Sequence, residues 1–403
     1  MRKLLIISFD ALGDSFFPAM LKRPRFAQFA KECLIRRGAD SVAVTNTYPV
    51  HTSVVTGVTP AAHGLASNSA FFPRRFPQWN YRAEAIQTET LWHAAAAQKR
   101  SVASVMWPVT GGARAIRWNI PELMKQPGEN QVLLNLRYGS KALQLFEVAK
   151  HFELMRGIPK QPYLDRFATA AMADILRGHK PDLALLHLTI FDYTCHEHGL
   201  SSPKPDEALD ELDISLGIML DAIQADTDVI VFSDHAQLPV HEHVLLNEHL
   251  RAKGLLEAAT DGAHIEYIEN SGMGCYFASE GGVAFLHAGR LSPAQIEALR
   301  AQCTAMPCTA RLLTKQELAD CGHAQFAFGL AAKPGYSFDR HANAEMANHG
   351  YPPSSENYKV FYMARGAAYP PGTETGGSLL DIAPMGAQSL GISFTPGKPM
   401  ARQ

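Results

Sequence analysis

The chain has few cysteines, a modest share of charged residues and no long apolar run. Its six cysteines among 403 residues lack the paired spacing of a zinc knuckle and the density of a disulfide scaffold, so reduced structural thiols are expected. Charged residues make up 19% of the sequence and the net charge is -2, which gives no broad attraction to nucleic acid or to an anionic membrane. Neither a nucleic-acid polymer nor a membrane is therefore predicted as a partner.

The N-terminal segment is the stretch that begins like a signal peptide. Two basic residues precede the apolar run from Leu4 to Phe9, but this run is short and ends at Asp10. No later apolar run is long enough to span a bilayer. We interpret the segment as a buried first strand and expect a cytoplasmic protein.

Apolar, strand-like runs that end in polar residues alternate with amphipathic helical patterns along the chain. This alternation predicts an α/β fold with a mostly parallel central sheet flanked by helices. Three predicted strands matter for function, at residues 4–9, 183–189 and 229–233. Between the last two, apolar residues repeat with helical spacing from Leu209 to Ile223, which indicates a helix packed on the core.

Two stretches are predicted insertions into one catalytic domain that spans residues 1–403. Residues 108–162 mix basic, aromatic and glycine residues, and we expect them to form a cap over the strand ends. Residues 238–340 carry their own pattern of strands at 274–278, 283–287 and 326–331, with a helix that begins at Ser292-Pro293. This pattern predicts a smaller inserted α+β subdomain.

Carboxylates and imidazoles follow the predicted strands and a later loop: Asp10, Asp192, His196, Asp234, His235 and His349. Ligands bind beyond the carboxyl ends of strands in open α/β sheets, so these side chains can converge although they lie far apart in sequence. Asp192 and His196 have the four-residue spacing that can close on one ion in a tight loop or turn. Carboxylates and neutral imidazoles are ligands that suit zinc. Any one of them alone is more often structural, but the ordered spacing recurs across the set.

Thr47 stands at the start of a predicted helix, with Pro49 just inside it. The free N–H groups and the dipole of a helix N-terminus favour anionic oxygen, and a metal ion would complete the activation of the hydroxyl as a nucleophile. The alternative is that Thr47 only caps the helix.

Other histidines are weaker candidates. His241 and His243 would share a face if their segment were a strand, but because enough ligands are already assigned, a solvated loop is predicted there. His187 lies within a predicted buried strand, so its imidazole needs a hydrogen-bond partner.

The motifs resemble those of the nucleotide pyrophosphatase/phosphodiesterase branch of the alkaline phosphatase superfamily, over nearly the whole chain outside the predicted insertions. Besides Asp10, they are Thr47-Tyr48-Pro49-Val50-His51, residues 56–64, Asn68, residues 192–199, Ser233-Asp234-His235 and His349-Gly350-Tyr351. The resemblance implies an alkaline-phosphatase-like fold and a metal-dependent phosphodiesterase or nucleotide pyrophosphatase.

The resemblance also implies two zinc ions. Other divalent metals would serve in their place. The ligands would be Asp192, His196 and His349 for one ion, and Asp10, Asp234, His235 and Thr47 for the other. Thr47 would attack phosphorus to give a phosphothreonine, which water then hydrolyses. Asn68 would donate to a phosphoryl oxygen, or else is a turn residue. Tyr48 would stack on a base or aryl leaving group, or else is ordinary packing.

Three departures from the family pattern leave the substrate open: Val50, Ala236 and Pro352-Pro353. We expect a small phosphorylated substrate, with nucleotides among the candidates. A phosphonate hydrolase is the main alternative, followed by a phosphomonoesterase or a non-catalytic metal-binding protein. A sulfatase is disfavoured, because it would need cysteine or serine in place of Thr47. The sequence does not predict the oligomeric state.

Overall fold

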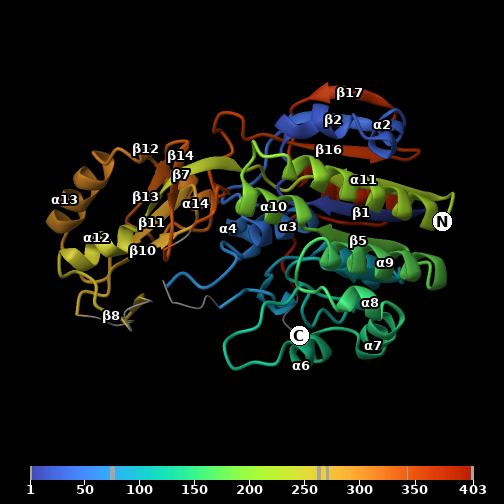
Figure 1. The fold of residues 1–403 in the computed structure, drawn as a ribbon, viewed down its shortest axis with the longest axis horizontal. Coiled ribbons are helices and arrows are strands. Elements are labelled where there is room, and N and C mark those ends of the chain that lie inside the picture. The colour runs from blue at the N-terminus through green and yellow to red at the C-terminus, as the bar shows by residue number, and fades with distance from the viewer. Residues whose placement is uncertain (1, 73–77, 261–264, 269–271, 343, 401–403) are drawn as a thin grey trace.

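The computed structural model describes residues 2–72, 78–260, 265–268, 272–342 and 344–400. An eight-stranded sheet forms the centre, in the order β17-β2-β16-β6-β1-β5-β3-β4 (Figure 1). Its strands are β1 (Lys3–Phe9), β2 (Leu34–Ala39), β3 (Val102–Val105), β4 (Trp118–Ile120), β5 (Leu183–Leu188), β6 (Thr227–Phe232), β16 (Val360–Arg365) and β17 (Gly372–Thr375). β16 runs antiparallel to β2 and β6, and the other neighbouring pairs are parallel. The predicted mostly parallel sheet is confirmed.

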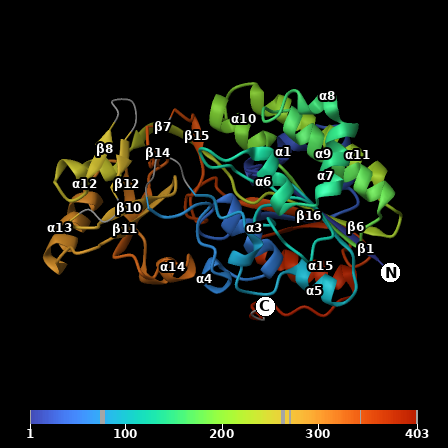
Figure 2. The same ribbon diagram turned by 90° about the horizontal axis from the view of Figure 1, so that it is seen from below.

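Helices cover both faces of this sheet. Alternate residues of its central strand, β1, point to opposite sides and pack against different helices. Leu5 and Ile7 of β1 pack towards α2 (Pro24–Ala30), α9 (Tyr163–Gly178) and α11 (Lys204–Ala222). Leu4 and Ile6 pack towards α3 (Thr47–Thr56), α5 (Leu91–Ala97) and α15 (Ile382–Leu390); in Figure 2, α5 and α15 lie below the strands and α9 and α11 above them. The apolar stripe on α11, from Leu209 to Met219, is buried in the core as predicted.

Shorter elements connect these layers. Within residues 108–162, β4 extends the large sheet beside β3, and three helices follow it: α6 (Gln131–Tyr138), α7 (Lys141–Lys150) and α8 (Phe152–Met155). Helix α10 (Ile190–His198) follows β5. The remaining short helices are η1 (Asp14–Phe16), α1 (Phe17–Met20), α4 (Pro60–His63), η2 (Ala83–Ala85) and η3 (Leu379–Asp381).

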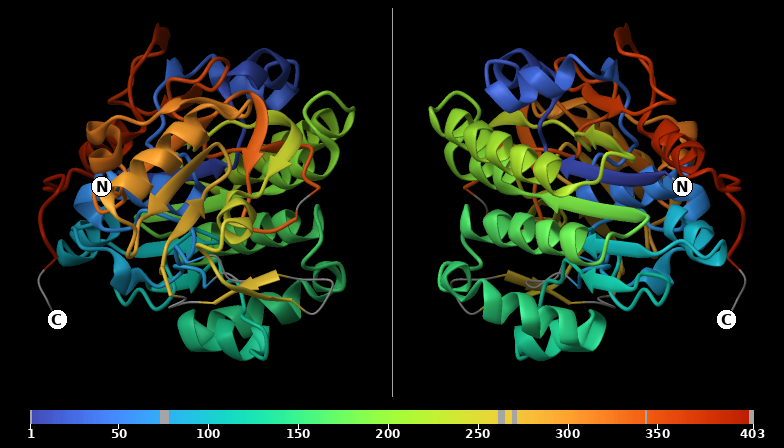
Figure 3. Two further views of the ribbon diagram at one scale, coloured as in Figure 1. Left: turned by 90° about the vertical axis from the view of Figure 1, so that its left-hand side faces the viewer. Right: turned by 90° about the vertical axis from the view of Figure 1, so that its right-hand side faces the viewer.

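A second, antiparallel sheet lies within residues 238–340, to the left of the large sheet in Figure 1 and towards the viewer in the left view of Figure 3. Its strands are β10 (Tyr276–Ser279), β11 (Val283–His287), β12 (Thr309–Leu312) and β13 (Phe328–Ala332), with helices α12 (Leu246–Ala252), α13 (Pro293–Thr304) and α14 (Lys315–Asp320). Phe277, Leu286 and Leu330 belong to a core cluster of its own. Ser292 caps α13 in a capping box with Gln295. The division of the chain into a domain and two insertions stays a prediction.

A three-stranded sheet joins this region to the rest of the chain. β7 (Leu238–Val244) lies between β14 (Gly335–Phe338) and β15 (Ala347–Asn348), and a small hairpin pairs β8 (Ala258–Thr260) with β9 (Ile265–Tyr267). The prediction of a loop at residues 241–243 is wrong, because β7 finds pairing partners that are distant in sequence. Nδ1 of His243 contacts the Asp339 carboxylate, so its imidazole has a structural partner.

Among the described residues, no helix combines the length and the apolar character needed to cross a membrane. The cytoplasmic location and the absence of membrane and nucleic-acid partners stay predictions.

Candidate functional site

The candidate site forms where three adjacent parallel strands end. β1 lies between β5 and β6, so its carboxyl end is next to theirs. Asp10 directly follows β1, Asp192 lies in the first turn of α10 just after β5, and Asp234 follows β6 by two residues. The order of the strands therefore brings the three predicted carboxylates to one edge of the sheet.

Thr47 is the first residue of α3, every residue of which is buried. The helix has Asn46 as its N-cap, so Thr47 is not the capping residue. Its Oγ1 lies 3.4 Å from Nε2 of His235. The hydroxyl thus sits at the positive end of a helix dipole and beside an imidazole at the strand ends.

One group of candidate ligands consists of Asp10, Asp234 and His235, whose ligand atoms lie within 4.8 Å of one another. Nε2 of His235 is 3.3 Å from Oδ1 of Asp10 and 3.3 Å from Oδ2 of Asp234. Oδ1 of Asp234 accepts hydrogen bonds from the backbone N–H groups of Ala11 and His235. In contrast, Oδ1 of Asp10 and Oδ2 of Asp234 are buried and accept none. These two oxygens are left for another partner.

A second group consists of Asp192, His235 and His349, again with ligand atoms within 4.8 Å. Nε2 of His196 lies 3.3 Å from Oδ1 of Asp192. Nδ1 of His196 lies 2.9 Å from the Ala347 carbonyl oxygen, an outer contact that orients the ring. The two side chains lie together as expected, but the expectation of a tight loop or turn is wrong. Both residues lie on α10, one helical turn apart.

The structure therefore brings all six predicted acidic and imidazole residues together with Thr47. His235 belongs to both groups, and the His196 and His349 rings lie 5.3 Å apart. Nδ1 of His349 lies 2.8 Å from Oδ1 of Asn46, which leaves its Nε2 for other contacts. How seven ligands divide between two ions stays a prediction.

Electrostatics of the site favour a bound cation. Burial, reinforced by Asp234 and Asp192, raises the pKa of Asp10 well above its usual value. Burial also raises the pKa of Asp234 to about 6 and lowers that of His235 to about 4. Crowded, buried carboxylates are costly as anions, and a divalent ion would offset that cost. Burial likewise lowers the pKa of His349 to about 3. The orphaned oxygens, the neutral imidazoles of His235 and His349 and the mixed O and N donor set thus fit divalent metal ions.

The predicted substrate-binding residues lie next to Thr47 in different settings. Oδ1 of Asn68 accepts a hydrogen bond of 2.8 Å from the Tyr48 N–H group, so the amide NH₂ of Asn68 remains the donating group near the helix start. The Tyr48 side chain is fully buried, and its ring centroid lies 5.3 Å from that of Trp79. The phosphoryl contact of Asn68 and the stacking role of Tyr48 stay predictions.

Sequence reasoning missed Glu122, which follows β4 at the same edge of the sheet. Its Oε2 is buried without a hydrogen-bond partner, and burial, together with Asp192 and Asp234, raises its pKa to about 8. An acidic residue two positions after a strand is the signal that could have found it. His187, predicted only to need a partner, also lies at the site, with Nε2 3.2 Å from Oδ2 of Asp10.

Glu280 is a second missed residue, and it supports the site from the antiparallel sheet. It lies in the turn between β10 and β11, and its side chain is 4% exposed. Its carboxylate accepts hydrogen bonds from Nδ2 of Asn46 (2.6 Å) and Oγ of Ser67 (2.7 Å), and it pairs with Arg340. It therefore holds both the start of the Thr47 helix and the loop that carries Asn68. No local pattern marks such a residue.

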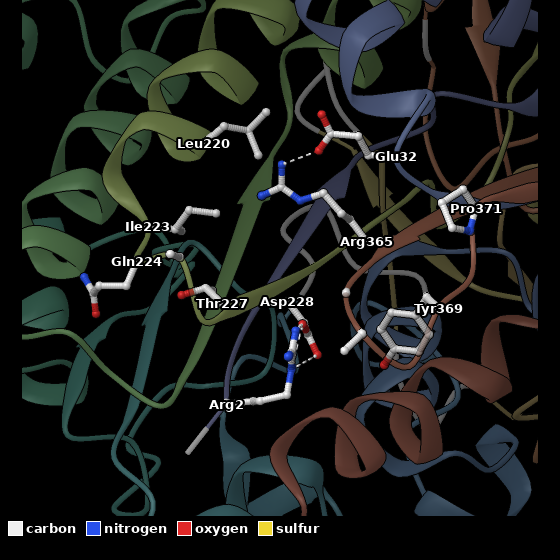
Figure 4. Close-up of a pocket in the computed structure, with 13 residues that line it drawn as sticks. Arg2, Glu32, Leu220, Ile223, Gln224, Thr227, Asp228, Arg365, Tyr369 and Pro371 are labelled. Atoms are coloured by element: carbon white, nitrogen blue, oxygen red, sulfur yellow. Dashed lines mark hydrogen bonds and ion pairs between the residues drawn. The ribbon is translucent and has the colours of Figure 1, made fainter.

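A separate cavity of about 640 Å³ lies at the amino ends of β1 and β6, opposite the candidate site (Figure 4). Arg2 pairs there with Asp228, and Arg365 lies 3.4 Å from Glu32. Both guanidinium groups already have carboxylate partners, so the cavity does not share the chemistry of the candidate site.

Solved structures with the same fold include murine ectonucleotide pyrophosphatase/phosphodiesterase 5, with a TM-score of 0.67 and 17% identity over 99% of this chain and 98% of that one. Phosphonoacetate hydrolase from Sinorhizobium meliloti has a TM-score of 0.68 and 16% identity over 96% of each chain. These likenesses show that the fold is the predicted alkaline-phosphatase-like one.

Curated relatives match shorter segments. Bis(5'-adenosyl)-triphosphatase ENPP4 from Homo sapiens is 32% identical over 114 residues, which are 27% of this chain and 25% of the relative. Ectonucleotide pyrophosphatase/phosphodiesterase family member 1 from Homo sapiens is 24% identical over 224 residues, 51% of this chain and 20% of the relative. The matches thus span a quarter or less of each relative. The family model described as type I phosphodiesterase / nucleotide pyrophosphatase matches residues 4–303. The chain belongs to the type I phosphodiesterase/nucleotide pyrophosphatase family.

Proposed function

We propose that the protein is a two-metal hydrolase that cleaves phosphodiester or pyrophosphate bonds of small phosphorylated molecules, with Thr47 as the nucleophile. The observation that carries this proposal is the position of Oγ1 of Thr47, at the start of a buried helix and 3.4 Å from the imidazole that both ligand groups share. A hydroxyl in a merely structural role would not need two groups of buried carboxylates and imidazoles around it.

Oγ1 of Thr47 attacks phosphorus and releases its proton to solvent. The bond from phosphorus to the leaving oxygen breaks, and the leaving group departs as an alcohol, which takes up a proton from solvent, or as a nucleotide phosphate. A phosphothreonine remains, and water hydrolyses it to regenerate Thr47. Two divalent ions, zinc by prediction, would polarise the phosphoryl oxygen and lower the pKa of the hydroxyl. The NH₂ group of Asn68 and the N–H groups at the start of α3 donate to the non-bridging oxygens as their charge changes.

The surroundings of the site favour a diester over a monoester. The charged groups that most affect the pKa of Asp10, Asp234 and Glu122 are carboxylates and imidazoles. A monoester dianion needs an additional cation for its extra charge, whereas a diester carries one negative charge. No lysine or arginine is among these groups, so they do not supply the additional cation that a dianionic phosphate needs.

Nucleotides are the proposed substrate class. Relatives of this chain are named for bis(5'-adenosyl)-triphosphate, and an inactive form of the murine structural neighbour is described in complex with AMP. A phosphonate hydrolase is the second candidate, because the phosphonoacetate hydrolase structure covers 96% of this chain.

The test compares three substrates on zinc-loaded protein: the p-nitrophenyl ester of a nucleotide, p-nitrophenyl phosphate, and phosphonoacetate with phosphate release as the readout. We expect the highest kcat/KM for the nucleotide diester. Faster turnover of phosphonoacetate would select the second candidate. Turnover of none of the three, by protein shown to hold metal, would refute the proposed activity.

A further inference from the structure

Three side chains away from the candidate active site form another cluster of potential metal ligands. Glu147 lies on α7, His151 caps the end of that helix, and Asp174 lies on α9. Their ligand atoms all lie within 4.8 Å of one another. Helices α7, α8 and α9 lie together on one side of the molecule in Figures 1 and 2. Spacing by four residues brings Glu147 and His151 to the same side of the chain.

The inner member of this cluster is a buried carboxylate oxygen without a partner. The Glu147 side chain is 2% exposed, and its Oε2 accepts no hydrogen bond. That oxygen lies 3.5 Å from Nε2 of His151, which in turn lies 2.8 Å from Oδ2 of Asp174. Burial, reinforced by Asp174, raises the pKa of Glu147 to about 7. An unpaired buried carboxylate oxygen is costly, and a cation bound between the three side chains would offset that cost.

We propose that Glu147, His151 and Asp174 bind one Zn²⁺ ion that is separate from the metals of the candidate active site. Two carboxylate oxygens and one imidazole nitrogen are ligand types that zinc takes, and water would fill the fourth position. The ion ties the end of α7 to α9 and closes the chain between residues 147 and 174. Its role is structural: it fixes α7, within residues 108–162, onto a helix that covers the central sheet.

The ion reaches this site from solvent through a neighbouring hollow. A cavity of about 400 Å³ is lined by His151 and Asp174, together with Arg166 and Arg177. The side chains of His151 and Asp174 are 20% and 17% exposed. They form the outer side of the site, and Glu147 forms its buried floor.

Lys150 allows a test that distinguishes a zinc site from an ordinary network of ion pairs. Its Nζ lies 2.6 Å from Oδ2 of Asp174, and its side chain is 45% exposed. The ammonium group therefore competes with zinc for this oxygen, and its long stem lets it swing away. Removal of Lys150 would weaken a simple ion-pair network, but it would strengthen zinc binding. Removal of His151 would weaken both.

The experiment measures zinc per chain by mass spectrometry after the full-length protein is dialysed against buffered free Zn²⁺ over a range of concentrations. The wild type is compared with His151→Ala, Lys150→Ala and the matched control His241→Ala, which removes an exposed histidine on β7. We expect His151→Ala to hold one zinc fewer per chain than the wild type. Lys150→Ala should bind as many zinc ions as the wild type, but its last site should fill at a lower concentration of free Zn²⁺. His241→Ala should match the wild type.

Equal zinc content in His151→Ala and the wild type would overturn the proposal. If His151→Ala does not fold, the near-isosteric Glu147→Gln takes its place and is expected to lose the same single ion; unchanged zinc in that variant also overturns the proposal. The result does not depend on the proposed function, because it is a difference between variants. Diester hydrolysis by the wild type and by His151→Ala is measured in parallel. Hydrolysis by the wild type tests the proposed function alone.

Discussion

Removal of the Glu280 carboxylate should damage both stability and catalysis, although Glu280 lies outside the predicted ligand set. This buried group accepts hydrogen bonds from Asn46 and Ser67 and pairs with Arg340. Glu280→Ala leaves two buried donors without this acceptor and removes the carboxylate that pairs with Arg340. The Arg340 guanidinium then keeps only neutral acceptors, on Ser279, Ser69 and Ala70. Loss of one partner from a buried ion pair costs about 3–5 kcal/mol. Since the three contacts share one carboxylate, their costs do not add, and we expect a loss of about 3–5 kcal/mol in the free energy of unfolding.

The same substitution should lower kcat, because Asn46 links Glu280 to the candidate site. The amide nitrogen of Asn46 donates to Glu280, and its oxygen lies 2.8 Å from Nδ1 of His349. Without Glu280, the Asn46 amide is free to turn, and both His349 and the start of the Thr47 helix lose a fixed contact. A misplacement that costs about 1.4 kcal/mol in the transition state gives a tenfold drop in kcat.

The assay combines urea unfolding with the kinetics of nucleotide diester hydrolysis. Glu297→Gln is the matched control, because Glu297 pairs with Arg300 on the surface of the same region at 3.2 Å and is 65% exposed. Such a surface pair contributes at most about 1 kcal/mol. If Glu280→Ala costs no more stability than this control and leaves kcat unchanged, the inferred support from Glu280 is wrong.

Three further predictions concern the proposed nucleophile, a proposed metal ligand and the pH dependence of stability. Thr47→Ala should abolish diester turnover while metal content, measured by mass spectrometry, stays near the wild-type value; near-normal turnover would refute the covalent mechanism. Asp192→Ala should lower the metal content itself, and unchanged metal would remove Asp192 from the ligand set. Hydrogen bonds from Arg311 lower the pKa of Glu317 from 4.5 to about 2. The stabilisation by this pair is therefore present above pH 4.5 and lost as the pH falls through about 2, so the stability difference between the wild type and Glu317→Gln should be smaller at pH 3 than at pH 7 in urea unfolding.

The central sheet and the candidate ligands at its strand ends were predictable because their signals are local. The runs that become β1, β5 and β6 are nearly continuous apolar segments, which strands buried on both faces require. Each is followed within a few residues by an acidic side chain, and parallel strands place their carboxyl ends together. The capping box at Ser292 marked the start of α13 for the same local reason.

What the sequence could not predict depends on pairing between distant segments. β7 is a strand because β14 and β15, about a hundred residues later, lie on either side of it. Glu280 matters through contacts with residues 213 and 234 positions earlier in the chain. The four-residue spacing of Asp192 and His196 does not distinguish a tight turn from one turn of helix, and both lie on α10.

The region of residues 238–340 is tied to the candidate site at both ends and at one point between them. His235 precedes β7 by three residues, and His349 directly follows β15. These two strands pair, with Leu238 opposite Asn348, so the pairing sets the distance between two proposed ligands. Between these ends, Glu280 reaches back to Asn46, which directly precedes Thr47, the proposed nucleophile. Folding of this region therefore fixes two imidazoles and the start of α3 together, and a lesion in its core should reduce activity and stability in the same variants.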